Sequence, residues 1–264
     1  MPAAADDPPA ADPLAHVAGL PGVAESVEEA RRAVDALRGH RVLRRSAERV
    51  ASEAALRGAR ASAALEGADV PLDVVRRTVS AGGRLPADGE GVVQGALRVA
   101  AEIGPLQPTW RRAPLQAVAR LHTLAASDLV DDIDALGRPA PAAATRLAAL
   151  GELLTASSVA PAVVVAAVVH GELATMGAFD SGAGVVARAA ARLTLVGRGL
   201  DPGSVTAPEV GFVEIGRDTH LDALRSYADG GPDGIAAWVR HCAEAVVLGA
   251  REGVAICEAI QRGA

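Results

Sequence analysis

Residues 170–188 read HGELATMGAFDSGAGVVAR, where a helix-like run gives way to a glycine-punctuated turn and then to a second run. The turn is GAFDSGAG, residues 177–184, and the apolar spacing at 160–176 and 185–196 is typical of helices. The first N–H groups of a helix have no partner within it, so a glycine turn at that point can accept an anion. We expect two helices joined by a tight turn, which either binds phosphate or simply lets the chain reverse.

Gly182, Ala183 and Gly184, followed by Ala187, also fit the pattern G-x-G-x-x-A of dinucleotide-binding proteins. That motif follows an apolar strand, whereas residues 170–180 carry His, Glu, Thr and Met in a helix-like order. An NAD-binding oxidoreductase is therefore the least favoured interpretation of the turn.

A second short motif lies far upstream, where Ser62-Ala-Ala-Leu-Glu66-Gly67 fits the pattern [S/T]-x-x-x-E-[G/N]. Together the two segments resemble the Fic (Fido) family of adenylyltransferase-like proteins, over roughly residues 55–260. In that family the upstream pattern is inhibitory, and the central motif is H-P-F-x-[D/E]-G-N-G-R-x-x-R with an earlier His on the same helix. The resemblance implies AMP transfer from ATP to a protein hydroxyl (AMPylation).

The central motif is only half preserved. Five positions agree with the family: His170 at the upstream His, Phe179 at the Phe, Gly182 and Gly184 at the two glycines, and Arg188 at the final Arg. Five positions differ: Gly177 stands at the catalytic His, Ala178 at the Pro, Ser181 at the acidic residue, Ala183 at the Asn and Val185 at the first Arg. We therefore expect no intact catalytic residue.

The missing residues remove specific chemistry that the resemblance would imply. Gly177 can abstract no proton, so the roughly 10²- to 10⁴-fold contribution of a positioned base is absent. Ser181 is a poor Mg²⁺ ligand beside a carboxylate, and Asp180 should point elsewhere if the loop keeps the family geometry, so we predict no metal site. His170 lies seven helical residues, roughly 10 Å, from Gly177 and is expected to be a buried, hydrogen-bonded histidine.

Phosphate binding could outlast catalysis. Gly182, Ala183, Gly184 and Arg188 remain candidates to bind the phosphates of ATP or another nucleotide. In the inhibited state of the family, the inhibitory Glu pairs with the final Arg, which implies an ion pair between Glu66 and Arg188. A partly buried pair is costly to break, so its retention has a structural as well as a regulatory explanation. Ser62 is expected to help end a short helix that carries Glu66.

Composition supports a helical fold. Only 2% of the 264 residues are aromatic, so Ala, Val and Leu must fill the core, and they pack best between closely spaced helices. We predict an all-α, Fido-like bundle, with residues 129–141 forming a loop or a short β-hairpin flap because Gly137, Pro139 and Pro141 interrupt them.

The chain divides into an N-terminal tail and one domain. Residues 1–20 begin acidic and proline-rich without a basic or apolar signal region, so we expect a disordered tail rather than a signal peptide. The expected parts of the single domain, residues 21–264, are an inhibitory helix around 59–67, a core over 90–200 and C-terminal helices over 217–261. Within it we predict a break at Gly39, a capping box from Ser26 to Glu29, and a helix over 92–103 closed by Gly104 and Pro105.

The net charge and the apolar content argue against nucleic acid and membranes as partners. The net charge of −6, with arginine as every basic residue, argues against nucleic acid and anionic lipid as ligands. The apolar run over 159–169 is far shorter than the roughly 20 residues of a membrane span. Cys242 and Cys257 lie roughly 22 Å apart if they share one helix, too far for a disulfide. These features favour a cytoplasmic protein without membrane association.

The sequence leaves three functions open. We favour a pseudoenzyme of the Fic type, with transfer lost or weak, that binds a nucleotide or an unknown protein target. A working transferase with another phosphate donor is an alternative. A non-catalytic interaction or regulatory module, such as a toxin–antitoxin partner, is another, and a homodimer is compatible with each.

Overall fold

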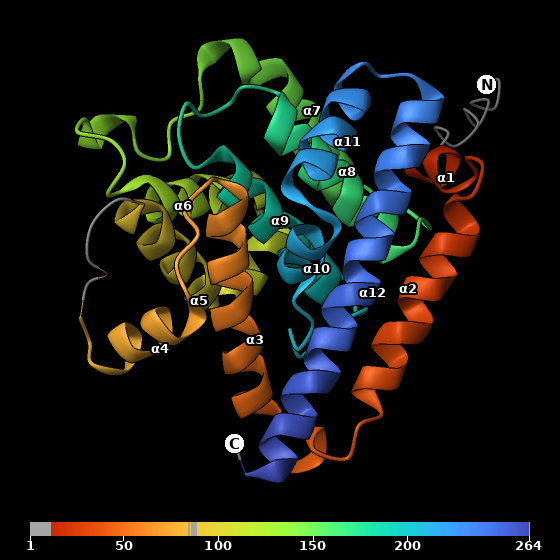
Figure 1. The fold of residues 1–264 in the computed structure, drawn as a ribbon. Coiled ribbons are helices and arrows are strands. Elements are labelled where there is room, and N and C mark those ends of the chain that lie inside the picture. The colour runs from red at the N-terminus through yellow and green to blue at the C-terminus, as the bar shows by residue number, and fades with distance from the viewer. Residues whose placement is uncertain (1–11, 84, 86–88, 264) are drawn as a thin grey trace, which may run out of the picture.

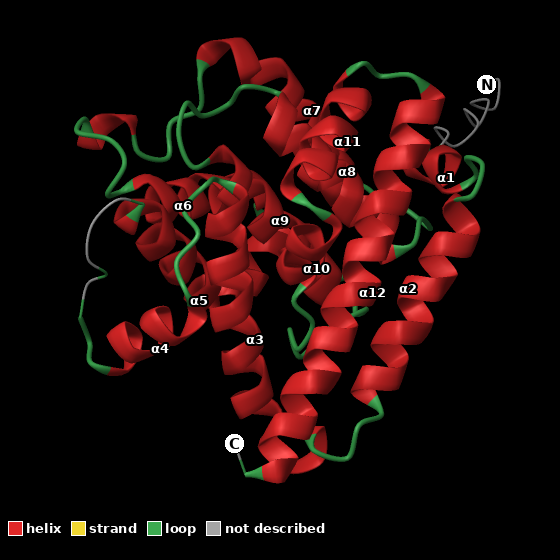
Figure 2. Ribbon diagram, viewed as in Figure 1, coloured by secondary structure: helices red, strands yellow, loops and turns green. Residues whose placement is uncertain are grey.

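In the computed structural model, residues 12–83, 85 and 89–263 are described, and they fold into helices and short turns without a β-strand (Figure 2). The predicted helical class is confirmed. Of the loop or short hairpin expected over residues 129–141, the structure shows the loop: it contains a 3₁₀ turn, η1 (Ile133–Ala135), and leads into a second, η2 (Pro141–Ala143). Asp132 accepts the N–H of Asp134 and caps η1, and a proline at residue 139 cannot donate to a strand ladder.

Two helices, α8 (Ala162–Thr175) and α9 (Ala183–Gly197), form the buried centre of the molecule (Figure 1). Their residues are mostly Ala, Val and Leu, which allow close approach, and the two helices predicted on either side of the glycine turn are confirmed. Trp238 is fully buried beside α8 and donates its indole N–H to the carbonyl of Ala167 at 2.8 Å.

The other helices surround this pair. They are α1 (Pro13–Ala18), α2 (Val23–Arg38), α3 (Leu43–Leu65), α4 (Leu72–Ser80), α5 (Glu90–Arg112), α6 (Pro114–Ala126), α7 (Ala144–Thr155), α10 (Pro208–Ile215), α11 (Arg217–Ala228) and α12 (Pro232–Arg262). The long helix α12 runs beside α2 on one flank of the molecule, and α3 lies in front of α5 and α9 (Figure 1).

The break at Gly39 is confirmed, since Gly39 caps α2 at its C-terminus. The capping box from Ser26 to Glu29 is wrong. Gly22, in a left-handed conformation at φ 74°, is the N-cap, and the hydroxyl of Ser26 donates to the carbonyl of Gly22 at 2.9 Å. A serine hydroxyl in the first turn of a helix can donate to the backbone carbonyl four residues earlier, and it then does not act as an N-cap.

The predicted end of a helix at Gly104 and Pro105 is also wrong, because α5 continues through Pro105 and Pro108 to Arg112. Leu106 and Trp110, beyond the first proline, are both buried in the core. Burial of these side chains outweighs the hydrogen bonds that proline removes, since most helical stability in proteins comes from packing.

The disordered tail predicted over residues 1–20 is wrong from Pro13 onward; residues 1–11 lie outside the described residues. Asp12 caps α1 by accepting the N–H groups of Leu14 and Ala15 at 3.0 and 3.3 Å. Its second oxygen accepts from the hydroxyl of Ser158 at 2.9 Å, and Leu14 is buried. A capping aspartate before Pro13 thus starts α1.

Cys242 and Cys257 both lie buried on α12 and are free thiols. Across the described residues, no helix combines the length and the apolar character that crossing a membrane requires.

Candidate functional site

The glycine turn connects α8 to α9 at the centre of the fold. Gly177 follows the C-cap Met176 in a left-handed conformation, φ 66°, and is exposed with open space around its Cα. Phe179 holds the turn in place: it is buried and stacks on the ring of His122, with centroids 3.9 Å apart. The turn ends at Gly182, the N-cap of α9, also left-handed at φ 69°. Two glycines therefore stand where other residues would be strained.

The N-terminus of α9 already holds a carboxylate. Gly182 offers no side chain to cap the first turn, so its N–H groups have no side-chain acceptor from the N-cap. The side chain of Glu66 fills this space: a Cβ on Gly184 would collide with Glu66 Oε1 and lie 3.1 Å from Arg188 Nη1. Only glycine fits at residue 184 while Glu66 is in place.

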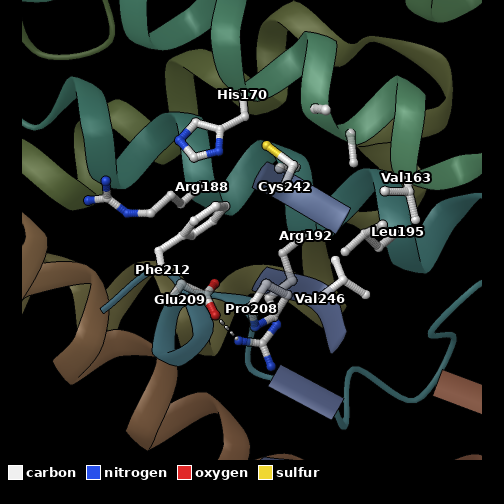
Figure 3. Close-up of a pocket in the computed structure, with 13 residues that line it drawn as sticks. Val163, His170, Arg188, Arg192, Leu195, Pro208, Glu209, Phe212, Cys242 and Val246 are labelled. Atoms are coloured by element: carbon white, nitrogen blue, oxygen red, sulfur yellow. Dashed lines mark hydrogen bonds and ion pairs between the residues drawn. The ribbon is translucent and has the colours of Figure 1, made fainter. Parts of the chain in front are cut away.

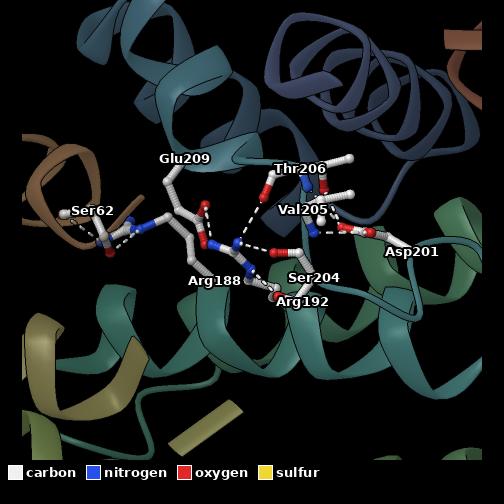
Figure 4. Close-up of polar contacts among 8 residues, drawn as sticks. All are labelled: Ser62, Arg188, Arg192, Asp201, Ser204, Val205, Thr206 and Glu209. Atoms are coloured by element: carbon white, nitrogen blue, oxygen red, sulfur yellow. Dashed lines mark hydrogen bonds and ion pairs between the residues drawn. The ribbon is translucent and has the colours of Figure 1, made fainter. Parts of the chain in front are cut away.

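Arg188 binds Ser62, near the end of α3 (Figure 4), and also binds Glu66. Its Nη2 lies 2.7 Å from Glu66 Oε1 and donates to the carbonyl of Ser62 at 3.0 Å, while its Nε donates to the Ser62 hydroxyl at 2.9 Å. The Arg188 side chain is 3% exposed and that of Glu66 is 31% exposed. We call Ser62, Glu66 and Arg188 the Arg188 clamp.

The expected ion pair between Glu66 and Arg188 is confirmed, but the expected role of Ser62 is wrong. Ser62 lies inside a helix of 23 residues and binds Arg188, rather than ending a short helix over 59–67. Gly67 follows in a left-handed conformation at φ 94°, which lets the chain turn sharply after Glu66.

One turn further along α9, Arg192 anchors a second buried network that sequence reasoning missed (Figure 4). Arg192 Nη1 lies 3.2 Å from a carboxylate oxygen of Glu209, and Nη2 donates to the carbonyl of Thr206 at 2.6 Å. Asp201 accepts both the N–H and the hydroxyl of Thr206. The network joins the loop after α9 to α10, and its signal in the sequence was an arginine four residues after Arg188.

His170 sits on the buried side of α8, as predicted. It is 1% exposed and lies edge-on to Trp238 and Phe212, with centroids 4.9 and 5.3 Å apart. Its Nε2 has no hydrogen-bond partner among the described residues, so the predicted hydrogen bonding is not found at that atom. Nearby, His220 Nδ1 lies 3.0 Å from His241 Nε2. Burial lowers the pKa of His170 well below its usual value, that of His220 to about 3 and that of His241 to about 4.

A cavity of about 20 Å³ lies between His170, Phe212 and Cys242, with Arg192 and Glu209 on its far side (Figure 3). This volume suits about one water molecule and excludes a nucleotide.

His122 joins the loop before η2 to the glycine turn. Its Nδ1 accepts the N–H of Gly137 at 2.9 Å, and burial lowers its pKa. The N–H of Ala140 donates to the carbonyl of Ala178 at 2.8 Å. The loop over 129–141 and the turn that carries Phe179 are therefore held together.

With this geometry in place, comparison with known proteins is informative. No protein-family model and no curated protein matches the chain. Among solved structures, a Fic family protein from Desulfovibrio desulfuricans G20 superimposes with a TM-score of 0.71 over 89% of this chain and 74% of that one, at 19% identity. A segment of Fic-1 from C. elegans gives a TM-score of 0.70 over 92% and 74%, at 15% identity. The chain has the Fic fold.

Structural similarity at identities this low shows only that the chain has the Fic fold. What the site can do chemically must be argued from the residues that this chain has there. The structure brings together, at the N-terminus of α9, the predicted residues Gly182, Ala183, Gly184, Arg188 and Glu66. His170 lies behind this group in the core.

The donors at the turn do not fit Mg²⁺, the metal implied by the resemblance. The Ser181 hydroxyl is buried without a hydrogen-bond partner among the described residues, and Asp180 is exposed. Within residues 12–83, 85 and 89–263, no group of three or more His, Cys, Asp or Glu side chains could hold a metal ion. A hard cation prefers several oxygen ligands, carboxylates above all, so no step is assigned to a metal here.

Proposed function

We propose that this Fic-fold protein is a pseudoenzyme that binds the phosphates of ATP or another nucleotide at the N-terminus of α9 and transfers AMP weakly or not at all. The observation that carries the proposal is the Arg188 clamp, which sets a carboxylate and a guanidinium beside Gly184 in the first turn of α9. The cation that holds one anion here can hold another, and the N-terminus of a helix favours an anion at the same place.

The phosphate site depends on three features of this chain. Gly182 leaves the first turn of α9 without a side-chain cap, and Gly184 leaves space above it. Arg188 supplies a buried cation that already binds an oxygen anion at 2.7 Å. A phosphate would compete with the Glu66 carboxylate for this position, because both are oxygen anions that suit a helix N-terminus and a guanidinium.

The weak transfer depends on the missing base. Gly177 has no side chain to accept a proton from a target hydroxyl, and neither neighbouring imidazole can replace it. His122 is buried and uses its Nδ1 on Gly137, while His170 is enclosed in the core. A general base must lie within hydrogen-bond reach of the proton that it removes.

Two measurements on the purified protein test the proposal. The first is thermal unfolding with and without millimolar ATP, for the wild type and for Glu66→Gly. A ligand at one hundred times its Kd adds about 2.7 kcal/mol to the free energy of unfolding, so we expect a measurable rise in Tm. The second is transfer of label from ATP to the protein itself and to lysate proteins, which we expect to be weak or undetectable.

The outcomes separate the alternatives. A Tm that ATP leaves unchanged in both proteins would favour the interaction module over a nucleotide-binding protein. Strong label transfer would instead show a working transferase. Glu66→Gln is the matched variant, because it keeps the size of the side chain and removes its charge, and it should fall between the wild type and Glu66→Gly.

A further inference from the structure

The last carbonyl groups of α3, those of residues 62–65, have no partner within the helix, so each must find one elsewhere. The terminal turn satisfies two of them. The carbonyl of Ala63 accepts the N–H of Ala68 at 3.0 Å, and that of Ala64 accepts the N–H of Gly67 at 2.9 Å. The carbonyls at residues 62 and 65 are left for groups outside this turn, and a guanidinium binds each of them.

The two guanidinium groups come from distant helices. Arg188 of α9 donates from Nη2 to the carbonyl of Ser62 at 3.0 Å and is the cation of the Arg188 clamp. Arg217, the first residue of α11, donates from Nε to the carbonyl of Leu65 at 2.8 Å, across 152 residues of sequence. Leu65 directly precedes Glu66, so Arg217 binds the chain next to the carboxylate that lies at the first turn of α9.

A sharp corner between α10 and α11 places Arg217 there. Gly216 is both the C-cap of α10 and the N-cap of α11, with φ at 114°. Its N–H donates to the carbonyl of Phe212 at 3.1 Å, and its carbonyl accepts the N–H of His220 at 3.0 Å. Because glycine adopts this φ without strain, α11 can begin after a single residue, with Arg217 beside the end of α3.

Charge explains why a second cation is favourable at this point. The C-terminus of a helix carries partial negative charge, and Glu66, the C-cap of α3, adds a carboxylate at the same end. Glu66 and Gly67 are exposed, and nothing lies within 4 Å of a Cβ placed on Gly67, so the turn has room to move outward. The hydrogen bonds at the end of α3, rather than atoms packed around Gly67, therefore limit that movement.

We propose that Arg217 is a positioning residue, which binds the Leu65 carbonyl, keeps Glu66 at the first turn of α9 and so lowers the affinity of that site for phosphate. The inference rests on the proposed function, which supplies the ligand. Arg217 acts through Glu66 and not by contact with the phosphate. When the bond to Leu65 is lost, Glu66 pairs with Arg188 for a smaller fraction of the time, and the apparent affinity for phosphate rises with the fraction of open molecules.

Hydrogen exchange without nucleotide tests the hold on α3. The N–H groups of Gly67 and Ala68 are bonded within the terminal turn, so their exchange reports its opening. In Arg217→Ala we expect exchange about three- to tenfold faster than in the wild type, the loss of one charge-assisted hydrogen bond at a partly exposed site. Arg217→Lys should restore part of the protection, because an ammonium also donates to a carbonyl.

Arg225→Ala is the matched control for hydrogen exchange. Arg225 lies on the same helix, is 68% exposed and pairs with Asp222. This variant should exchange as the wild type does. Unchanged exchange in Arg217→Ala, or an equal increase in Arg225→Ala, would overturn the inference.

ATP titration tests the positioning role. Arg217→Ala should bind ATP about three- to tenfold more tightly than the wild type, whereas a purely structural contact would not tighten binding when it is removed. In the Glu66→Gly background the same substitution should change nothing, because no carboxylate remains to be positioned.

The outcomes of the titration separate this inference from the proposed function. If Glu66→Gly binds ATP more tightly than the wild type and Arg217→Ala does not, Arg217 does not position Glu66. Tighter binding from Arg217→Ala in the Glu66→Gly background would also overturn the inference. If ATP binds none of these proteins, the proposed function fails together with the effect of Arg217 on phosphate, and hydrogen exchange still decides whether Arg217 holds the turn.

Discussion

Glu66 occupies the position that a nucleotide phosphate would need. Its replacement should therefore raise the affinity for ATP and lower the free energy of unfolding. In Glu66→Gly, the first turn of α9 and Arg188 become accessible to phosphate, and ATP should bind more tightly. The free energy of unfolding should fall by about 1–3 kcal/mol, because a buried guanidinium loses its anion and keeps only Ser62. ATP titration and urea unfolding of the same variant measure the two effects. If Glu66→Gly folds and binds ATP with wild-type affinity, the Arg188 clamp only holds α3 against α9 and does not block nucleotide binding.

A side chain at residue 177 would be strained by the backbone conformation there, and it would also lack the other groups that transfer needs. Gly177→His should cost about 1–2 kcal/mol, since a side chain at φ 66° is strained although nothing lies within 4 Å of its Cβ. Transfer should remain weak because Ser181 brings no carboxylate and Val185 no guanidinium, and groups that act as a unit are not restored singly. Label transfer and urea unfolding provide the readouts, with Gly177→Asn as the control that tolerates this conformation better. Transfer at the level of an active Fic enzyme from Gly177→His would contradict this account of the site.

At this scale, the resemblance of two motifs to those of the Fic family predicted that Glu66 and Arg188 meet across 122 residues. Ser62 was recognised as part of a motif, but it was expected to end a helix, whereas it binds Arg188. A serine near a helix end has several possible hydrogen-bond partners, and the local sequence does not determine which one it binds. Arg192 was missed altogether: two of its four hydrogen bonds go to the backbone carbonyls of Ser204 and Thr206, which carry no side-chain signature.

Among the helices, α8, α11 and α12 together bury three histidines that cannot accept a proton readily. His220 and His241 have a folded-state pKa of about 3 and about 4, and that of His170 lies well below its usual value. Burial is the main cause in each case, and the Arg188 cation adds to it for His170 and His220.

The consequence is a loss of stability in acid. In the unfolded chain these histidines take up protons below about pH 6.5, whereas in the folded chain His241 and His220 take them up only near pH 4 and pH 3, and the pKa of His170 also lies well below its usual value. The unfolded state therefore binds more protons in this window, and the free energy of unfolding should fall as the pH falls, by up to about 1.4 kcal/mol per pH unit for each histidine. Urea unfolding at several pH values measures this slope.

A histidine variant assigns that slope to the cluster. His241→Gln should reduce the pH dependence, because one buried titrating group is removed. An equal slope in the wild type and in His241→Gln would show that other groups dominate acid unfolding.

Helix boundaries show where local sequence rules stop being sufficient. Pro105 is a helix breaker by local rules, yet α5 continues past it because Leu106 and Trp110 are buried on the far side. In the opposite direction, α10 was not predicted: its pattern over 199–213 is irregular, and its start at Pro208 is set by contacts with α3 and α12. Periodicity identifies a helix that buries one stripe and fails for a short one enclosed on several sides.

For the whole molecule, composition predicted closely packed helices, because an Ala- and Val-rich chain has few aromatic side chains to fill its core. The particular arrangement was predicted by the resemblance of two motifs, in order, to those of the Fic family. The same close approach leaves little tolerance in the packing. Gly211 on α10 lies against the backbone of Ala245 on α12, and Gly249 lies against Ala207 before α10. In both places a single methyl group would meet backbone atoms, which cannot give way as a flexible side chain can.

Gly211→Ala should therefore destabilise the whole molecule, although alanine is the better helix former. Overpacking of a closely packed core costs about 1–3 kcal/mol, which exceeds the roughly 0.5–1 kcal/mol gained from replacing a helical glycine. Because α10 also carries Glu209 and Phe212, its displacement should disturb the partners of Arg192 and the surroundings of the fully buried Trp238. Urea unfolding followed by tryptophan fluorescence measures both effects.

Glu244→Ala, on the exposed side of α12, is the control and should stay within about 0.5 kcal/mol of the wild type. A Gly211→Ala protein more stable than the wild type would mean that α10 can move away from α12 without loss, and that close helix packing does not hold this end of the site.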